Sequence, residues 1–148
     1  MRGWQRAGAL VRLFAPNDAR FAHPALARPQ ILFACKAAAT DPSLRPQHTL
    51  LPLADLLQVE FNRDFFESEE RALVRTVLEA PGPALIAWKH VTMHVIANEI
   101  LGNKTTAPQH WPYSCYDIVW VFDRRDGVWT FSQIPQLLLP GDSADIII

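Results

Sequence analysis

The stretch ALIAWKHVTMH, residues 84–94, contains the change of pattern from which the fold of the chain is predicted. The apolar run that ends at Trp88 is typical of a buried strand. Two polar residues follow it, and an apolar pattern at helical spacing then runs over residues 91–101, before Gly102 as a typical helix-ending residue. His90 is therefore expected just beyond a strand and at the N-terminus of a helix.

The same alternation of strand and helix patterns continues through the rest of the chain. We predict helices over residues 4–14, 45–58, 67–80 and 91–101, strands over 31–34 and 84–88, a brief edge strand or loop within 59–66, and a hairpin of 116–123 with 128–135. In the third helix Leu73, Val77 and Leu78 are expected to face inward, whereas Pro52 conflicts with an unbroken second helix. This order of elements predicts an α/β three-layer sandwich, in which a C-terminal β-hairpin adds an antiparallel strand to a mostly parallel central sheet.

The composition limits the functions that we expect of this chain. Its 148 residues, 49% of them apolar, fit one globular domain over residues 1–148, and a net charge of −1 gives no basic field for nucleic acid. Cys35 and Cys115 stand apart without C-x-x-C spacing, so we expect free thiols and neither a metal site nor a cofactor. Arg6 and Arg12 interrupt the first apolar stretch, which predicts an amphipathic helix, and no apolar run is long enough for a membrane span. We therefore expect a cytoplasmic protein.

Two positively charged or titratable side chains follow predicted strands and point to an anion site. In parallel sheets, ligands bind beyond the carboxyl ends of the strands, where helix N-termini favour anions. Arg45 begins the helix after the strand at 31–34, and His90 begins the helix after the strand at 84–88. If these strands are neighbours, the two side chains converge. A lone histidine at a helix start is more often a cap or surface residue, and His94, which lacks an H-E-x-x-H glutamate and a third ligand, is expected to be structural.

Four segments together resemble the histidine phosphatase superfamily, the phosphoglycerate-mutase-like group. LRPQHTLLPLADLL is similar to its R-x-x-x-T segment, and ALIAWKHVTMHVIANEILG is similar to its later strand-histidine-helix segment. YDIVWVFDRRDGVWTFSQIPQLLLPGD resembles the hairpin that closes many members, and RGWQRAGALVRLF resembles their first helix. The resemblance covers nearly the whole chain, in the order and spacing of the family.

The resemblance implies a site for phosphoryl transfer. A histidine of an R-H-G or R-H-A motif attacks phosphorus, two arginines and a second histidine hold the phosphoryl oxygens, and a carboxylate protonates the leaving oxygen. Arg45 matches the second arginine, and His90 matches the second histidine. The acid would be Asp64, with Glu60 and Glu67 as alternatives. The implied ligand is a small phosphorylated molecule or inorganic phosphate.

The chain departs from the family where the nucleophile belongs. That motif should end a first strand before the first helix, yet this sequence begins on the helix and contains no R-H-G or R-H-A. His23, His48 and His110 do not follow an arginine at the end of an apolar strand, so none replaces the nucleophile. We consider two explanations: a start codon assigned too late, or a natural short form that lost the nucleophile.

The cost of an exposed sheet interior favours the first explanation and predicts dimerisation through the vacated position. We therefore expect a remnant phosphate pocket without hydrolysis by the chain itself. The alternative is a non-catalytic domain that binds a phosphate ligand or another protein. A flavodoxin-like sheet is disfavoured because no Gly-rich or Ser/Thr-rich loop follows an early strand.

Overall fold

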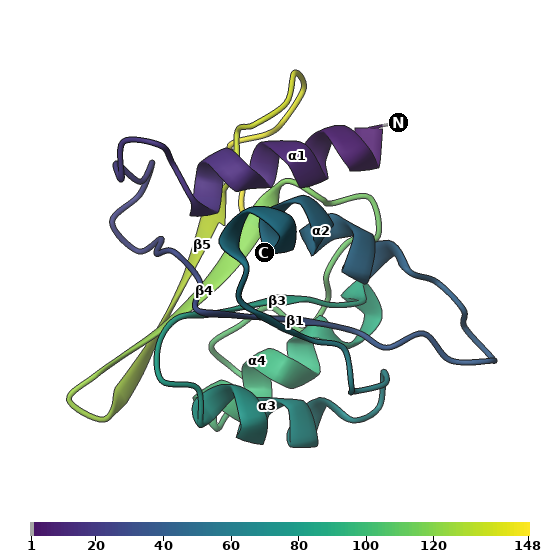
Figure 1. The fold of residues 1–148 in the computed structure, drawn as a ribbon. Helices are drawn as coiled ribbons and strands as arrows, with labels where there is room; N and C mark the ends of the chain where they lie inside the picture. The colour runs from purple at the N-terminus through teal and green to yellow at the C-terminus, as the bar shows by residue number, and fades with distance from the viewer. Residues whose placement is uncertain (1) are drawn as a thin grey trace.

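The computed structural model describes residues 2–148, and three short parallel strands form the centre of the fold. The strands are β1 (Ile31–Ala34), β2 (Glu60–Asn62) and β3 (Ala84–Ala87), in the order β2-β1-β3. Helices cover both faces of this sheet (Figure 1): α1 (Arg2–Phe14) and α2 (Arg45–Leu57) lie on one side, and α3 (Glu70–Leu78) and α4 (Met93–Leu101) lie on the other. The predicted α/β arrangement, with helices on both faces of a parallel sheet, is confirmed.

The central strand β1 separates two hydrophobic cores. Successive side chains of a strand point to opposite faces, so neighbouring residues of β1 enter different cores. Leu32 packs with Leu10 and Leu53 beneath α1 and α2, whereas Phe33 packs with Leu73 and Ile96 against α3 and α4. Because both faces are covered by helices, every position of this strand has to be apolar, which is why the sequence shows a continuous apolar run.

The segment that carries His90 differs slightly from its prediction. The strand β3 ends at Ala87, and a 3-10 turn, η1 (His90–Thr92), precedes α4. At the other end, the N–H of Gly102 donates to the carbonyl of Asn98 at 2.8 Å, with φ of +73° at the glycine. The predicted glycine end of the helix is confirmed, because this left-handed conformation carries little cost without a side chain.

The helix α2 continues through Pro52 in spite of the conflict noted in the sequence. A proline there cannot donate to the carbonyl of the residue four positions earlier, which costs about 3 kcal/mol in a helix interior. Leu50, Leu53 and Leu57 are buried on the side of α2 that faces the core. Burial of a leucine side chain contributes roughly 2 kcal/mol, so the packing of this helix face offsets the lost hydrogen bond.

The helix α3 is shorter than predicted. Residues 67–69 form a turn instead of helix, because the carboxylate of Glu69 accepts from the N–H of Phe66 at 2.9 Å and Ser68 has φ of +87°. Leu73 is buried and Val77 packs against the same core, but Leu78 is 41% exposed, so its predicted inward position is wrong. Leu78 lies about 100° further around the helix than Val77, beyond the edge of the buried face.

The C-terminal hairpin forms as predicted but does not join the parallel sheet. Its strands β4 (Ile118–Arg125) and β5 (Val128–Pro135) pair only with each other, around a turn in which Asp126 and Gly127 both have positive φ. The prediction that the hairpin adds a strand to the central sheet is therefore wrong. Val119 of β4 packs into the same core as Leu85 of β3, so side chains rather than backbone hydrogen bonds connect the hairpin to the sheet. The outer edge of β3 consequently has no strand partner within residues 2–148.

A buried ion pair joins α1 to the segment after the hairpin. The guanidinium of Arg6 donates to both carboxylate oxygens of Asp142, at 2.7 and 3.0 Å, and also to the side chain of Gln136 at 2.9 Å. The N–H groups of Leu138 and Leu139 donate to the same carboxylate, which is only 2% exposed. Hydrogen bonding from Arg6 therefore holds the pKa of Asp142 well below its usual value.

Replacing Asp142 with asparagine should lower the free energy of unfolding by roughly 3 kcal/mol at pH 7, because the buried guanidinium of Arg6 loses its counter-charge. Urea denaturation of both proteins measures this difference. Asp123→Asn is the matched control, since Asp123 pairs with Arg125 on the surface, and its loss should stay below about 1 kcal/mol. Equal losses for the two variants would show that the buried pair does not stabilise the fold.

The stabilisation by Asp142 should also depend on pH. Its pKa is lowered in the folded protein and lies near 4 in an unfolded chain, so the contribution is fully present above about pH 4 and is lost as pH falls towards the folded value. The difference between wild type and Asp142→Asn should therefore shrink in urea denaturations below pH 4. A difference that stays constant from pH 7 to pH 2 would contradict this account.

Candidate functional site

The strands that precede Arg45 and His90 are direct neighbours. Residues of β1 pair in register with those of β3, from Ile31 with Ala84 to the pair of alanines at their carboxyl ends. The chain leaves β1 through the loop of residues 35–44 and enters α2 at Arg45, and it leaves β3 through two residues into η1. Figure 1 shows the start of α2 and the start of α4 on the same side of the molecule. The prediction that Arg45 and His90 converge required these two strands to be neighbours, and they are.

The side chain of Arg45 is exposed and uncommitted. Its guanidinium has no hydrogen bond or ion pair to any residue in the described part of the chain, 2–148. Its backbone N–H donates to the hydroxyl of Ser43 at 3.4 Å, and its carbonyl accepts from the hydroxyl of Thr49 at 2.8 Å. The threonine of the R-x-x-x-T segment therefore acts within the first turns of α2, leaving the guanidinium available for a ligand.

His90 is half-buried at the start of η1, and its position is fixed by its neighbours. Its ring makes no hydrogen bond within residues 2–148. The indole N–H of Trp88, just before it, donates to Glu70 at 3.3 Å and to the hydroxyl of Thr92 at 3.1 Å. These contacts hold the residues on both sides of His90 while its imidazole stays free to donate or accept.

Lys89 is a site residue that the sequence analysis missed. Its ammonium donates to the carboxylate of Asp41 in the loop after β1, and only 13% of the lysine side chain is exposed. Burial alone would lower the pKa of Lys89, but the hydrogen bond to Asp41 and the negative charges around the ammonium, that of Asp41 before that of Glu67, together raise the pKa. Lys89 thus remains a cation at the same edge of the sheet as Arg45 and His90. The only signal in the sequence was its place directly before His90.

Cys35 is a buried thiol at the end of β1, near Lys89. The thiol directly follows β1 and is fully buried, and burial raises its pKa, while the nearby charge of Lys89 acts in the opposite direction. The loops after β1 and β2 also lie together, because the N–H of Lys36 donates to the carbonyl of Phe65 at 2.7 Å. Asp41, in the loop after β1, binds the Lys89 ammonium beyond the end of β3. Because the thiol is buried and its pKa is raised, Cys35 remains a protonated packing residue and not a nucleophile.

The three carboxylates considered for the acid occupy different places. Glu60 pairs with Ile31 at the first position of the strands, so it lies at the opposite edge of the sheet from Arg45. Asp64 is exposed in the loop after β2, and its carboxylate accepts no hydrogen bond within residues 2–148. Of the three, Glu67, later in that loop, is the one whose negative charge acts on Lys89, where it helps to raise the pKa of the ammonium.

Glu70 is a buried carboxylate that holds Trp88, two residues before His90, in place. One of its oxygens accepts from the indole of Trp88 and from the N–H of Ser68, at 3.3 and 3.0 Å. The bond from Trp88 joins the start of α3 to the segment that carries His90, and the bond from Ser68 closes the turn before the helix. No sequence pattern distinguished Glu70 from the exposed glutamates around it, because its burial depends on how α3 packs against β3.

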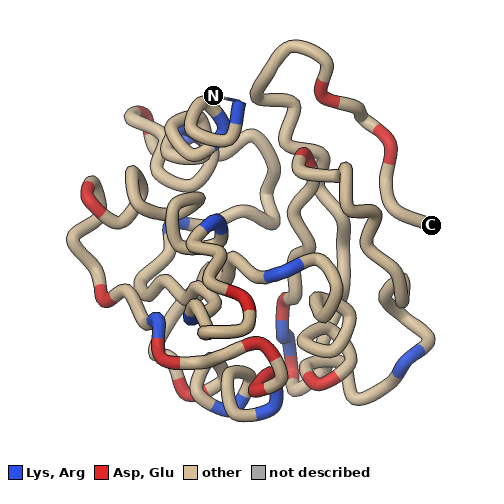
Figure 2. The backbone as a smooth tube through the Cα atoms, turned by 90° about the vertical axis from the view of Figure 1, so that its right-hand side faces the viewer, with Lys and Arg blue, Asp and Glu red and all other residues tan. Residues whose placement is uncertain are grey.

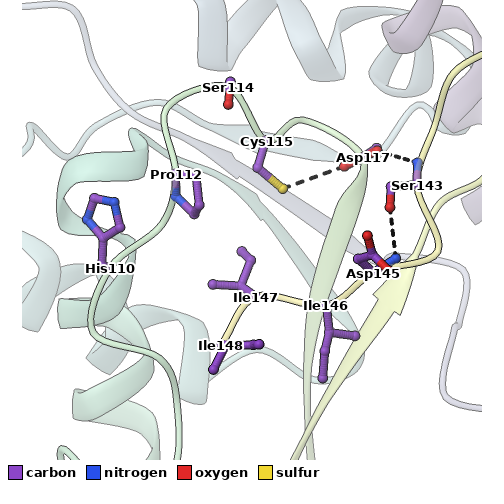
Figure 3. A pocket seen from close by; sticks show the side chains of 10 residues that line it. All are labelled: His110, Pro112, Ser114, Cys115, Asp117, Ser143, Asp145, Ile146, Ile147 and Ile148. Carbon is purple, nitrogen blue, oxygen red and sulfur yellow. Dashed lines mark hydrogen bonds between the residues drawn. The ribbon is translucent and has the colours of Figure 1, made fainter.

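An open hollow of about 480 Å³ lies elsewhere, between residues 110–117 and the C-terminal residues 143–148 (Figure 3). Asp117 in its wall accepts from the N–H of Ser143 at 2.8 Å and from the thiol of Cys115 at 3.5 Å. Burial raises the pKa of Cys115, so this thiol is also protonated. The hollow contains none of the predicted site residues.

Removing the carboxylate of Glu70 should destabilise the protein. In Glu70→Ala the N–H of Ser68 and the indole of Trp88 lose an acceptor, which should lower the free energy of unfolding by about 2 kcal/mol. Glu70→Gln keeps an acceptor oxygen and should cost less. Urea denaturation followed by tryptophan fluorescence measures the change, with Glu79→Ala at the exposed end of the same helix as control. If Glu70→Ala and Glu79→Ala cost the same, the support assigned to Glu70 is wrong.

Comparison of the chain with known protein families, with curated proteins and with solved structures finds no match. Residues 2–148 contain no group of three or more His, Cys, Asp or Glu side chains placed to hold a metal ion. No helix in that described range is both long enough and apolar enough to cross a membrane. The site is therefore characterised by its own geometry: Arg45, Lys89 and His90 at the carboxyl edge of a parallel sheet.

Proposed function

We propose that this chain is a histidine-phosphatase-like domain that binds a phosphate group at the carboxyl edge of its sheet. The observation that carries the proposal is the position of Arg45 and His90. Each begins a helical segment after one of two neighbouring parallel strands, and neither side chain has a polar partner within residues 2–148. The ligand is inorganic phosphate or the phosphate group of a small molecule.

The chemistry of the two side chains suits this ligand. A guanidinium presents a planar set of donors that matches two phosphate oxygens at once, and an imidazole supplies a further donor. Arg45 begins a helix of 13 residues, whose positive dipole end favours an anion. Basic and acidic residues are interspersed over the rest of the chain (Figure 2), so attraction of an anion depends on this local arrangement.

We propose binding without hydrolysis for this chain. Hydrolysis through phosphohistidine needs a nucleophile in an R-H-G or R-H-A motif, and neither motif occurs in these 148 residues. In a form that did carry the nucleophile, the loop after β2 would supply the proton donor. Glu67 is the better candidate there than Asp64, because its negative charge acts on the ammonium of Lys89, whereas Asp64 is exposed.

The second candidate function is recruitment of another chain. The strand β3 pairs only with β1, so its outer edge presents unpaired backbone groups within the described residues. Such an edge can accept a strand from a second copy or from another protein. The side chains of β3 are apolar and carry no charge that would prevent pairing.

Titration with inorganic phosphate, followed by calorimetry, tests the first function. Arg45→Ala should weaken binding roughly tenfold or more, because a charge-assisted hydrogen bond contributes about 1.5–3 kcal/mol. His90→Ala should also weaken it. Arg28→Ala is the matched control, since Arg28 is an exposed arginine in the loop before β1, at the other edge of the sheet, and it should bind phosphate like the wild type.

Two results would contradict the proposal. Phosphate binding that is unchanged in Arg45→Ala would place the ligand elsewhere. Turnover of p-nitrophenyl phosphate that His90→Ala abolishes would show that the chain hydrolyses phosphomonoesters without the expected nucleophile. If no phosphate binds and the protein dimerises with rising concentration in sedimentation experiments, the second function is favoured.

A further inference from the structure

The Lys89–Asp41 pair is unequal in its exposure. The lysine side chain is 13% exposed, whereas the side chain of Asp41 is 51% exposed. A cation that is largely removed from water needs a counter-charge, and the loss of its partner is costly. An exposed carboxylate, in contrast, is well solvated without a partner. Lys89 therefore requires an anion at this position, but the anion does not have to be Asp41.

Asp41 lies between Lys89 and the start of α2. One of its oxygens accepts from the Lys89 ammonium, and the other accepts from the N–H of Ser43 at 3.4 Å. Ser43 in turn accepts from the N–H of Arg45. The loop of residues 35–44 projects from the molecule in Figure 1. It thus places the carboxylate of Asp41 beside the residues of the proposed phosphate site.

The turn that carries Asp41 is closed by the backbone. The N–H of Ala38 donates to the carbonyl of Asp41 at 3.0 Å, and the N–H of Asp41 donates to the carbonyl of Ala38 at 3.1 Å. These two bonds involve only the backbone, so they persist when the Asp41 side chain rotates away from Lys89. The rotation breaks only the long bond from the Ser43 N–H in addition to the bond from Lys89.

We propose that Asp41 is an internal counter-anion of the phosphate site and that a bound phosphate takes its place on Lys89. The inference rests on the proposed function and adds two elements to it. Lys89 becomes a third binding residue beside Arg45 and His90, and the Asp41 carboxylate becomes an intramolecular competitor of the ligand. The exchange needs no change in the fold, because the buried cation has a partner before and after binding. A dianionic phosphate is the ligand class that competes best against a single carboxylate.

Removing the competitor should strengthen binding of inorganic phosphate. We expect Asp41→Asn to bind phosphate roughly tenfold more tightly than the wild type in calorimetric titrations, within the usual range of coupling between two competing groups. Asp55→Asn is the matched control, because it removes the same charge from an exposed position on α2 and should leave the affinity near that of the wild type. In the double variant with Lys89→Met, the gain from Asp41→Asn should disappear.

The single variant Lys89→Met gives an independent measurement in case Asp41→Asn does not fold. Its affinity for phosphate should be at least fivefold lower than that of the wild type, because the ligand loses the ammonium of Lys89. An unchanged affinity overturns the proposal. Wild-type binding that depends on Arg45 but does not tighten in Asp41→Asn would overturn this inference and leave the proposed function intact. Absence of phosphate binding in both wild type and Asp41→Asn would refute both.

Discussion

The in-register pairing of β1 with β3 determines the two cores and also the site. These strands run parallel at the middle and edge of a three-stranded sheet, and their side chains alternate between the core beneath α1 and α2 and the core beneath α3 and α4. Both strands end at the same edge. Since a helical segment follows each strand, after ten residues for β1 and after two for β3, that edge collects loops, helix N-termini and their polar side chains.

The features that depend on local pattern could be predicted from the sequence. The continuous apolar runs identified β1 and β3 because strands buried on both faces have no polar positions, and the starts of the helical patterns that follow them identified Arg45 and His90. The pairing of Lys89 with Asp41 could not be found in this way. It joins residues 48 positions apart through the conformation of a loop, and no periodic pattern records such a contact.

The hairpin shows a second limit of sequence patterns. Alternation and the Asp-Gly turn specify which strands pair with each other and which side chains share a face. They do not specify whether the hairpin joins a neighbouring sheet through its backbone. Here Val119 and Val121 reach the core shared with Leu85, while the backbone edges of β3 and β4 stay unpaired with each other. Whether a hairpin adds to a sheet is thus decided by tertiary packing.

The two cations at the carboxyl edge of the sheet, Arg45 and Lys89, differ in exposure and in whether they have a partner. Arg45 is exposed and tolerates the absence of a partner because water solvates it, whereas Lys89 is largely buried and is tolerated because Asp41 neutralises it. A ligand would gain from Arg45 without competition but would have to displace a carboxylate to reach Lys89. The selectivity of such a site for one anion over another therefore depends less on the number of its cations than on Lys89, because only an anion that displaces Asp41 can reach it.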